Sequence, residues 1–199
     1  MKELKYIDVT IDQLYLDPNN PRFPQDRQYE ESDIPNDDVQ KSTRERLNDL
    51  EDITNIKDSI ITVGYIPVNS ILVKKLNSID GKYLVVEGNC RSLALKEIND
   101  ELNNPLKLKK EVEESVKKIR VALINEDNDF EYELLGITHL IGTKQWKPYS
   151  QAKFLVKKLE EDGSLNINDV GEKFGLKPVT SANLIHSYYA YKQGQKDDI

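Results

Sequence analysis

Residues 84–98 constrain the fold more than any other part of this sequence. A largely β-branched run reaches Glu87 and Gly88, and the chain then passes at once into a helical pattern. The apolar positions of that pattern are Leu93, Ala94, Leu95 and Ile98, and Asn89 or Ser92 is suited to cap its first turn. The stretch therefore predicts a strand that enters a helix through a glycine turn.

Such a turn is suited to bind an anion. A strand that feeds a helix through a glycine brings several backbone N–H groups to one point, where the helix dipole also favours negative charge. Arg91, in the first helical turn, would add a planar guanidinium suited to phosphate or carboxylate. The same residues also fit an ordinary structural turn in which Arg91 caps the helix or pairs with Glu87. The residues alone leave both interpretations open.

Length and composition bound the class of protein. The 199 residues suffice for one large domain or two small ones, with 38% hydrophobic and 32% charged residues. No apolar run approaches the ~20 residues of a membrane span, and no secretory signal opens the sequence. One cysteine excludes an internal disulfide, and one cysteine with two histidines leaves no zinc-ligand cluster. We expect a cytoplasmic protein without a membrane partner.

The charge is distributed unevenly. The net charge is −7, which argues against nonspecific coating of nucleic acid. Residues 142–196 nevertheless hold nine lysines and five acidic residues, a local balance of +4. This asymmetry favours the C-terminal third for contact with a polyanion, although lysines on solvated helix faces would give the same count.

The first part of the chain has an α+β pattern. Strands are expected at 6–16, 71–73, 82–86 and 119–124, and a helix is expected from Arg46 through Ile60, ending at Gly64. The polar, acidic segment 25–45 is expected to be a surface insertion or a mobile loop, and 99–108 a loop.

The pattern becomes helical after Asn125. Helices are expected at 129–141 and after Pro148, the second ending at Gly163, and Trp146, Pro148 and Tyr149 are expected to form a hinge or a packed interdomain turn. Residues 166–176 and 178–185 predict a helix-turn-helix or, equally, any helical hairpin. Its expected core is Val170, Phe174, Leu176, Val179, Ala182 and Ile185.

Four stretches, in this order, resemble the ParB/sulfiredoxin superfamily, and within it the ParB-like partition and nucleoid-occlusion proteins. They are residues 11–14 with 20–22, residues 56–68, the Gly-x-x-Arg signature at 87–91, and the helix-turn-helix at 167–188. The resemblance implies a ParB/sulfiredoxin-like nucleotide-binding domain at 1–125 and an all-helical domain with a helix-turn-helix at 126–199. The chain stops just after this unit, so the family's C-terminal dimerisation domain is expected to be missing, from a truncated chain or a divergent short form.

The resemblance also implies a nucleotide site, with CTP or ATP as ligand and Mg²⁺ as a candidate metal. Gly88, Asn89, Cys90 and Arg91 would cradle the phosphates, Arg22 would stand near them, and the backbone from Gly64 to Pro67 would lie beside the base. The family's Glu-Asn-x-x-Arg metal motif is replaced by residues 138–144, which lack the acidic ligand. His139 is a replacement ligand, a phosphate contact or a helix-packing residue, and Lys144 could supply a cation. The metal ligands are therefore unknown.

The implied function is a nucleotide-responsive DNA-binding protein of ParB type, in which nucleotide closes two subunits into a clamp. The alternative is an enzyme, a phosphotransferase, kinase or nuclease, that uses Glu87 as a base beside the same pocket. Slow hydrolysis of CTP or ATP is a further candidate activity. Sulfiredoxin chemistry is rejected, because Cys90 comes one residue after the position that chemistry needs and would point about 100° away.

The expected DNA contacts lie on the second helix of the helix-turn-helix. Its N-terminal residues would face base edges, so Thr180, Ser181 and Asn183 are the predicted readers. Lys173, Lys177 and Lys192 would contact phosphates. With so few cations, a single unit is expected to bind weakly, so a homodimer is the expected DNA-binding form.

Overall fold

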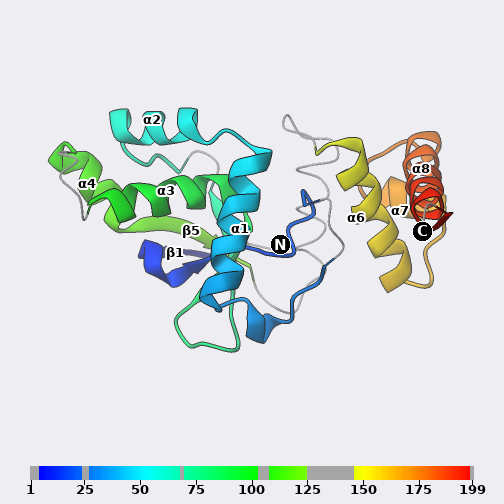
Figure 1. Ribbon diagram of the computed structural model, residues 1–199, viewed down its shortest axis with the longest axis horizontal. Coiled ribbons are helices and arrows are strands. Elements are labelled where there is room, and N and C mark those ends of the chain that lie inside the picture. The colour runs from blue at the N-terminus through cyan, green and yellow to red at the C-terminus, as the bar shows by residue number, and fades with distance from the viewer. Residues whose placement is uncertain (1–4, 24–26, 68–69, 103–107, 125–145, 198–199) are drawn as a thin grey trace. The chain divides into compact units, whose positions relative to one another are not determined.

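The structure is a computed structural model that describes residues 5–23, 27–67, 70–102, 108–124 and 146–197 (Figure 1). By its internal contacts the chain divides into two compact units. The first comprises Met1–Asn19 and Arg27–Asp127, and the second comprises Asn20–Asp26 and Asn128–Ile199. A short N-terminal segment thus groups with the helical end of the chain. The predicted boundary at 125/126 remains a prediction.

The first unit is built on a five-stranded mixed sheet. Its strands are β1 (Lys5–Val9), β2 (Leu14–Tyr15), β3 (Ile71–Lys75), β4 (Tyr83–Glu87) and β5 (Ile119–Leu123), in the order β1-β5-β3-β4-β2. The pairs β1–β5 and β3–β4 are antiparallel, whereas β5–β3 and β4–β2 are parallel. The central strands form because hydrophobic, largely β-branched runs can be buried on both faces: Val73, Val85 and Val121 are fully buried. The predicted strands at 71–73, 82–86 and 119–124 are confirmed.

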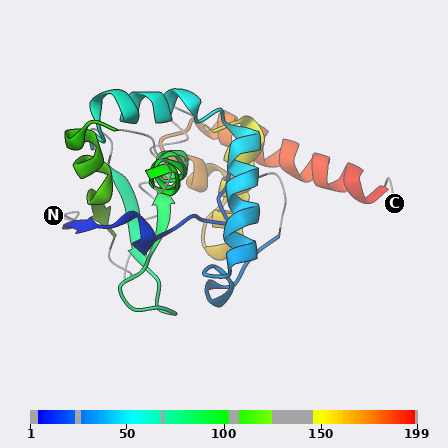
Figure 2. The ribbon, with the colours of Figure 1, turned by 60° about the vertical axis from the view of Figure 1, so that its left-hand side comes forward.

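Four α-helices accompany this sheet: α1 (Asp37–Leu50), α2 (Thr54–Val63), α3 (Asn89–Leu102) and α4 (Lys110–Lys117). The central one is α3, which contacts α1, α2, α4, β3 and β4, as well as the 3₁₀ helix η1 (Ile11–Gln13) (Figure 2). Its Leu93, Ala94 and Leu95 are completely buried. The glycine turn before α3 is therefore anchored from both sides, by the sheet and by the core helix. With helices and a mixed sheet, the fold is α+β.

The expected loop at 25–45 and the expected helix from Arg46 are wrong in their bounds. The 3₁₀ helix η2 (Glu31–Asp33) and most of α1 lie where a loop was expected, and α1 and α2 are separate helices. α1 begins earlier because Asn36 caps it, its Oδ1 accepting from the N–H of Asp38 at 2.9 Å. The chain breaks before α2, where Oδ1 of Asp52 accepts from the N–H of Thr54 at 2.9 Å.

The loop expected at 99–108 is also wrong in part, because α3 continues to Leu102. The predicted helix at 129–141 lies outside the described residues.

The second unit contains α6 (Pro148–Glu161), α7 (Ile167–Lys173) and α8 (Pro178–Asp197). Its core is aromatic: the ring of Phe154 makes edge contacts with Trp146 and Phe174, at centroid distances of 5.4 and 5.1 Å. Phe23 is also buried, and its carbonyl accepts from Nζ of Lys153 at 3.4 Å, which ties the 20–26 segment to α6.

Of the expected core residues of this unit, Val170, Phe174 and Ile185 are buried, but Val179 is 72% exposed. Val179 lies in the first turn of α8, with its side chain largely in solvent. Among the described residues, no helix has the length and apolar character needed to cross a membrane.

Candidate functional site

The predicted glycine turn lies between β4 and α3. Gly88 has φ +92°, a conformation that side chains disfavour, and an added Cβ would lie 3.1 Å from Cγ1 of Ile71. The first bond of α3 joins the N–H of Ser92 to the carbonyl of Gly88 at 2.9 Å. The N–H groups of residues 89–91 therefore precede the helical bonding pattern, which is the arrangement that favours anions at a helix start.

The side chain of Asn89 holds the fold together at this turn. Its Oδ1 accepts from the N–H of Asp17 at 2.9 Å, and its Nδ2 donates to the carbonyl of Val85 at 3.1 Å. Asn89 is buried, and these two bonds use both ends of its amide. These bonds fix the orientation of the Asn89 side chain, and its backbone N–H is among those at the helix start.

Arg91 lies over the turn. Its Nη2 is 3.5 Å from the position that a Cβ on Gly88 would occupy, so the guanidinium lies close to the backbone of the turn. Burial raises the pKa of the Tyr65 hydroxyl, and the positive charge of Arg91 opposes that shift. Arg91 and Cys90 are both half-buried. Gly88 and Arg91 thus lie close together, and Tyr65, which was not among the predicted side-chain contacts, is near enough for the Arg91 charge to act on its hydroxyl.

Tyr65 is positioned by the end of α2. Gly64, at φ +85°, ends this helix, with its N–H donating to the carbonyl of Ile60 at 2.8 Å. The next N–H, that of Tyr65, donates to Oγ of Ser115 on α4 at 3.0 Å. The predicted Gly64 is therefore a helix terminator, and the buried ring that follows it is the part that approaches Arg91.

The remaining predicted residues of the nucleotide site are placed as follows. Glu87 is the half-buried last residue of β4, opposite Leu72 of β3. Arg22 belongs to the second unit by its contacts, and its N–H donates to Oδ1 of Asn20 at 3.0 Å. His139 and Lys144 lie outside the described residues. Among the residues that the structure does describe, no group of three His, Cys, Asp or Glu is placed to hold a metal ion.

The predicted helix-turn-helix segment consists of α7, a turn at Gly175 with φ +76°, and α8. Asn166 caps α7 by accepting from the N–H groups of Asn168 and Asp169. Five of the six predicted DNA contacts lie close to this turn, and four of these are exposed: Lys173, Lys177, Thr180 and Asn183. The contact farther along α8, Lys192, is half-buried.

The fifth predicted contact, Ser181, must be corrected. It is fully buried, and its Oγ donates to the carbonyls of Pro178 and Ile167 at 3.0 and 3.3 Å. It packs directly on α7, where a Cβ on Gly171 would come within 2.3 Å of its own Cβ. Ser181 therefore joins the two helices and is not available to a base.

A groove between α6 and α8 was not predicted. Its lining includes Tyr149 from α6, and Tyr188 and Tyr191 from α8, together with the predicted Thr180 and Asn183. The spacing of Leu184, Tyr188 and Tyr191 places them on one helix face, which was a usable signal. Tyr149 could not be assigned to this face from the sequence, because it comes from a different helix.

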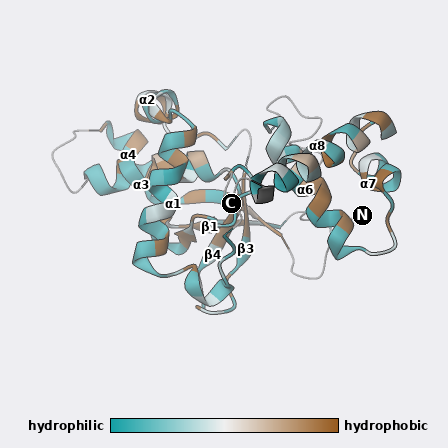
Figure 3. Ribbon diagram, turned by 45° about the vertical axis from the view of Figure 1, so that its right-hand side comes forward, coloured by the Kyte–Doolittle hydropathy of each residue, from teal (hydrophilic) through white to brown (hydrophobic). Residues whose placement is uncertain are grey.

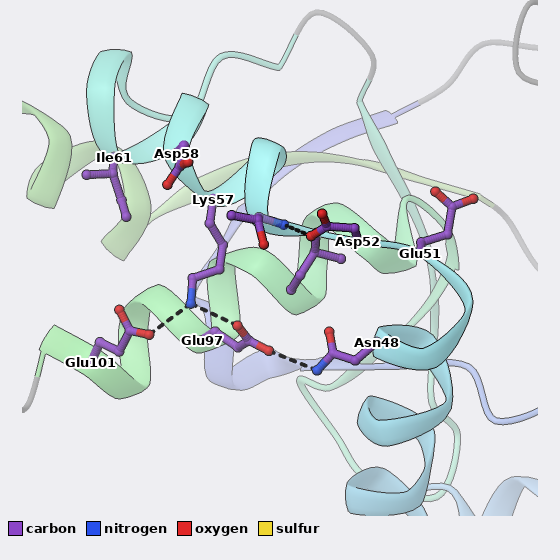
Figure 4. A pocket seen from close by; sticks show the side chains of 10 residues that line it. Asn48, Glu51, Asp52, Lys57, Asp58, Ile61, Glu97 and Glu101 are labelled. Atoms are coloured by element: carbon purple, nitrogen blue, oxygen red, sulfur yellow. Dashed lines mark hydrogen bonds and ion pairs between the residues drawn. The ribbon is translucent and has the colours of Figure 1, made fainter.

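A second hollow, in the first unit, is lined by residues of α1, the link between α1 and α2, α2 and α3, and half of these residues are acidic (Figure 4). Lys57 lies among them, its Nζ 2.9 Å from Oε2 of Glu97 and 2.8 Å from Oε1 of Glu101. The other oxygen of Glu97 accepts from Nδ2 of Asn48 at 3.2 Å. These contacts raise the pKa of Lys57, chiefly through the bond to Glu101, and they join three helices rather than form an open site.

No protein-family model matches the sequence, and no curated protein matches it. Among solved structures, the chain is similar to C-terminally truncated ParB from Caulobacter crescentus complexed to the centromeric parS site, with 15% identity, TM-score 0.45, and coverage of 89% of this chain and 69% of the other.

It is also similar to C-terminally truncated Caulobacter crescentus ParB complexed with CTP-gamma-S (17% identity, TM-score 0.39, 90% and 76% coverage). A Pnob8-like ParB-N domain is a third similar structure (13% identity, TM-score 0.43, 93% and 70% coverage). All three similarities are at 17% identity or less and at TM-scores of 0.45 or less.

Proposed function

We propose that this chain is a nucleotide-responsive DNA-binding protein of ParB type, with its phosphate pocket at the turn between β4 and α3. One observation carries the nucleotide part. A Cβ on Gly88 would crowd Ile71 at 3.1 Å, and the Arg91 guanidinium lies 3.5 Å from the position that this Cβ would occupy. A phosphate at this place would meet the backbone N–H groups of a helix start and a bidentate cation together.

The residues present fit a nucleotide as follows. Phosphate oxygens would accept hydrogen bonds from the backbone N–H groups of residues 89–91 and from Arg91, and the buried Tyr65 lies close enough for the Arg91 charge to act on its hydroxyl. Magnesium, if it takes part, would be held chiefly by phosphate oxygens and water, as is usual for this ion. His139, Lys144 and Arg22 remain proposed additions to the pocket.

The DNA-binding part rests on the exposed residues of α7 and α8. Lys173 and Lys177 would contact phosphates, and Thr180 and Asn183 would read bases. Since a single unit offers few cations, a homodimer is the proposed DNA-binding form, and nucleotide binding would favour it.

Thermal unfolding of the full chain tests the nucleotide pocket. CTP, ATP, GTP and ADP are added one at a time, with and without Mg²⁺; CTP-gamma-S, named in a similar structure, is a further probe. A ligand at 100 times its Kd should raise the Tm by roughly 5–10 °C. In Arg91→Ala this shift should disappear.

Arg44→Ala is the matched control. Arg44 is also a half-buried arginine of the first unit, but its Nη1 pairs with Asp100 at 2.8 Å and not with the turn. This variant should keep the full shift. The proposal fails if no nucleotide raises the Tm, or if Arg91→Ala responds as the wild type does.

Glu87 separates a nucleotide-gated binder from an enzyme. If it is a general base, Glu87→Gln should reduce turnover by about 10²–10⁴-fold and keep nucleotide affinity, because the side chain keeps its shape. If the chain is a binder, wild-type turnover is already very slow. Rapid wild-type turnover that depends on Glu87 would replace the proposed function with the enzymatic one.

A further inference from the structure

One face of α8 and the first turns of α6 enclose a groove of about 650 Å³ in the second unit. Three tyrosines line it: Tyr149 on α6, and Tyr188 and Tyr191 on α8. Thr180 and Asn183 lie on the same face of α8, closer to its start. The groove is separate from the turn at Gly88, which belongs to the first unit.

The three rings support one another. The centroid of Tyr149 lies 5.5 Å from that of Tyr188 and 5.4 Å from that of Tyr191, the second pair at an interplanar angle of 77°. Tyr191 is nevertheless 52% exposed. Rings already held by their neighbours lose little freedom when a ligand stacks on them, so the groove is partly preorganised.

Three lysines lie near the residues that line the groove, one by contact and two by position in the chain. Nζ of Lys192 lies 5.9 Å above the ring of Tyr188, and the exposed Lys147 directly precedes the first residue of α6. The exposed Lys177 stands at the start of α8, where its carbonyl accepts from the N–H of Thr180 at 2.9 Å. The acidic residue Glu160 acts on Tyr188. The pKa of Tyr188 is raised chiefly by burial, then by the nearby Tyr149, and then by Glu160.

We propose that this groove binds unpaired bases of single-stranded DNA. Tyr191 and Tyr188 offer rings on which bases stack, and the three lysines match the phosphates of the strand. Thr180 and Asn183 add a hydroxyl and an amide that can hydrogen-bond to base edges, which are fully accessible only in an unpaired base. A hydrophobic peptide fits less well, because it would offer Lys192, beside Tyr188, no negative counterpart. α8 carries hydrophilic and hydrophobic residues side by side along its length (Figure 3).

The test uses the full chain and labelled single strands of about 12 nucleotides at low salt, followed by fluorescence anisotropy. Wild-type protein should bind, and Tyr191→Ala should weaken binding roughly 5- to 150-fold, as expected for loss of one stacked base. Tyr191→Phe keeps the ring and should retain most of the affinity. Tyr6→Ala is the matched control, because Tyr6 is also an exposed tyrosine (47%) but lies on β1 of the first unit.

Three outcomes would overturn the proposal: no binding of single strands, equal affinity in Tyr191→Ala and wild type, or loss of self-association in Tyr191→Ala by sedimentation. The last would identify a second copy of the chain as the occupant. Duplex DNA is titrated in parallel, and equal losses for duplex and single strand would place Tyr191 on the duplex surface instead. The thermal shift with nucleotides and the anisotropy with single strands are separate readouts, so failure of the nucleotide pocket and failure of this groove are distinguishable.

Discussion

The helices α3 and α8 both begin at or shortly after a glycine with positive φ, but they use their polar residues in opposite ways. In α3, Asn89, Ser92 and Lys96 recur at helical spacing and are all buried. Asn89 bonds to two backbone groups, and Nζ of Lys96 donates to the carbonyl of Ile11 at 3.2 Å. The polar face of α3 thus fastens it to the N-terminal segment.

In α8, the corresponding polar side chains are on the surface. Thr180, Asn183 and Ser187 are exposed, and only Ser181 turns inward, where it contacts α7. A binding site at α3 must therefore rely on backbone N–H groups and Arg91, whereas a site at α8 can use side chains. The difference shows that a glycine turn before a helix does not by itself identify which residues bind a ligand.

The largest expected effect concerns the buried polar face of α3. Burial, with help from the Arg44 and Lys82 charges, lowers the pKa of Lys96 to about 8 from 10.5. Between these pH values the unfolded chain holds a proton that the folded chain has lost, so stability from this group rises with pH across the window. The rise is on the order of 3 kcal/mol. Urea unfolding at several pH values should show it in wild type and not in Lys96→Met.

Lys41→Met is the control for that measurement. Lys41 is an exposed lysine of α1 and is not among the charges that shift the pKa of Lys96. This variant should retain the wild-type rise between pH 8 and 10.5. An identical pH profile in wild type and Lys96→Met would show that Lys96 stays charged in the fold.

The next effect tests the turn that begins α3. Gly88→Ala should destabilise the fold by about 2–3 kcal/mol, from its positive φ and from the contact with Ile71. Gly81→Ala shares the cost of a positive φ, since φ of Gly81 is +69°, but a Cβ at Gly81 would meet nothing within 4 Å. It should lose only about 1–2 kcal/mol. Equal losses in denaturant unfolding would mean that Ile71 moves aside and that the turn is less tightly packed than the structure shows.

A smaller effect tests the single inward polar residue of α8. Gly171→Ala brings a Cβ within 2.3 Å of the Ser181 Cβ, so overpacking should exceed the helical preference for alanine and cost about 1–2 kcal/mol. The double variant Gly171→Ala with Ser181→Gly removes the crowded side chain at 181, so it should recover part of the stability lost in Gly171→Ala. Gly163→Ala, with nothing within 4 Å, is the control and should be close to neutral. Additive losses in the double variant would contradict direct contact between the two positions.

Much of the first unit's fold could be predicted, because its central strands are continuous hydrophobic runs between turn residues. The start of α1 could not be predicted from apolar spacing, because its buried positions are Thr43 and Leu47 and threonine is not counted as apolar. The order of the sheet could not be predicted, since β2 is only two residues long and pairs with β4 through distant contacts.

The candidate site was predictable as a location but not in its details. The glycine turn and Arg91 follow from local sequence. The use of the Asn89 amide does not, because its partner Asp17 is 72 positions away. Ser181 can be buried because Gly171, on the other helix, has no side chain. This contact joins two helices, so the spacing of residues within one helix does not predict it.

The smallest expected effect distinguishes phosphate contacts from base contacts on α8. Lys177 is exposed at the start of α8, where a lysine neutralises a phosphate without reading sequence. Lys177→Ala should weaken binding to all duplexes alike and reduce the slope of log K against log salt by about one unit. Asn183→Ala should instead keep the slope and reduce the difference between duplexes, because an amide reads base edges.

Titrations of labelled duplexes, including one carrying the parS site, at several salt concentrations measure both quantities. Lys41→Ala, an exposed lysine on α1 of the first unit, is the control and should leave the slope unchanged. If Lys177→Ala and Lys41→Ala lower the slope equally, the effect reflects overall charge and α8 has no special role. If no duplex binds even at low salt, α7 and α8 form a structural helical hairpin. The binding of single strands would then be the one remaining proposed role of the exposed polar face of α8.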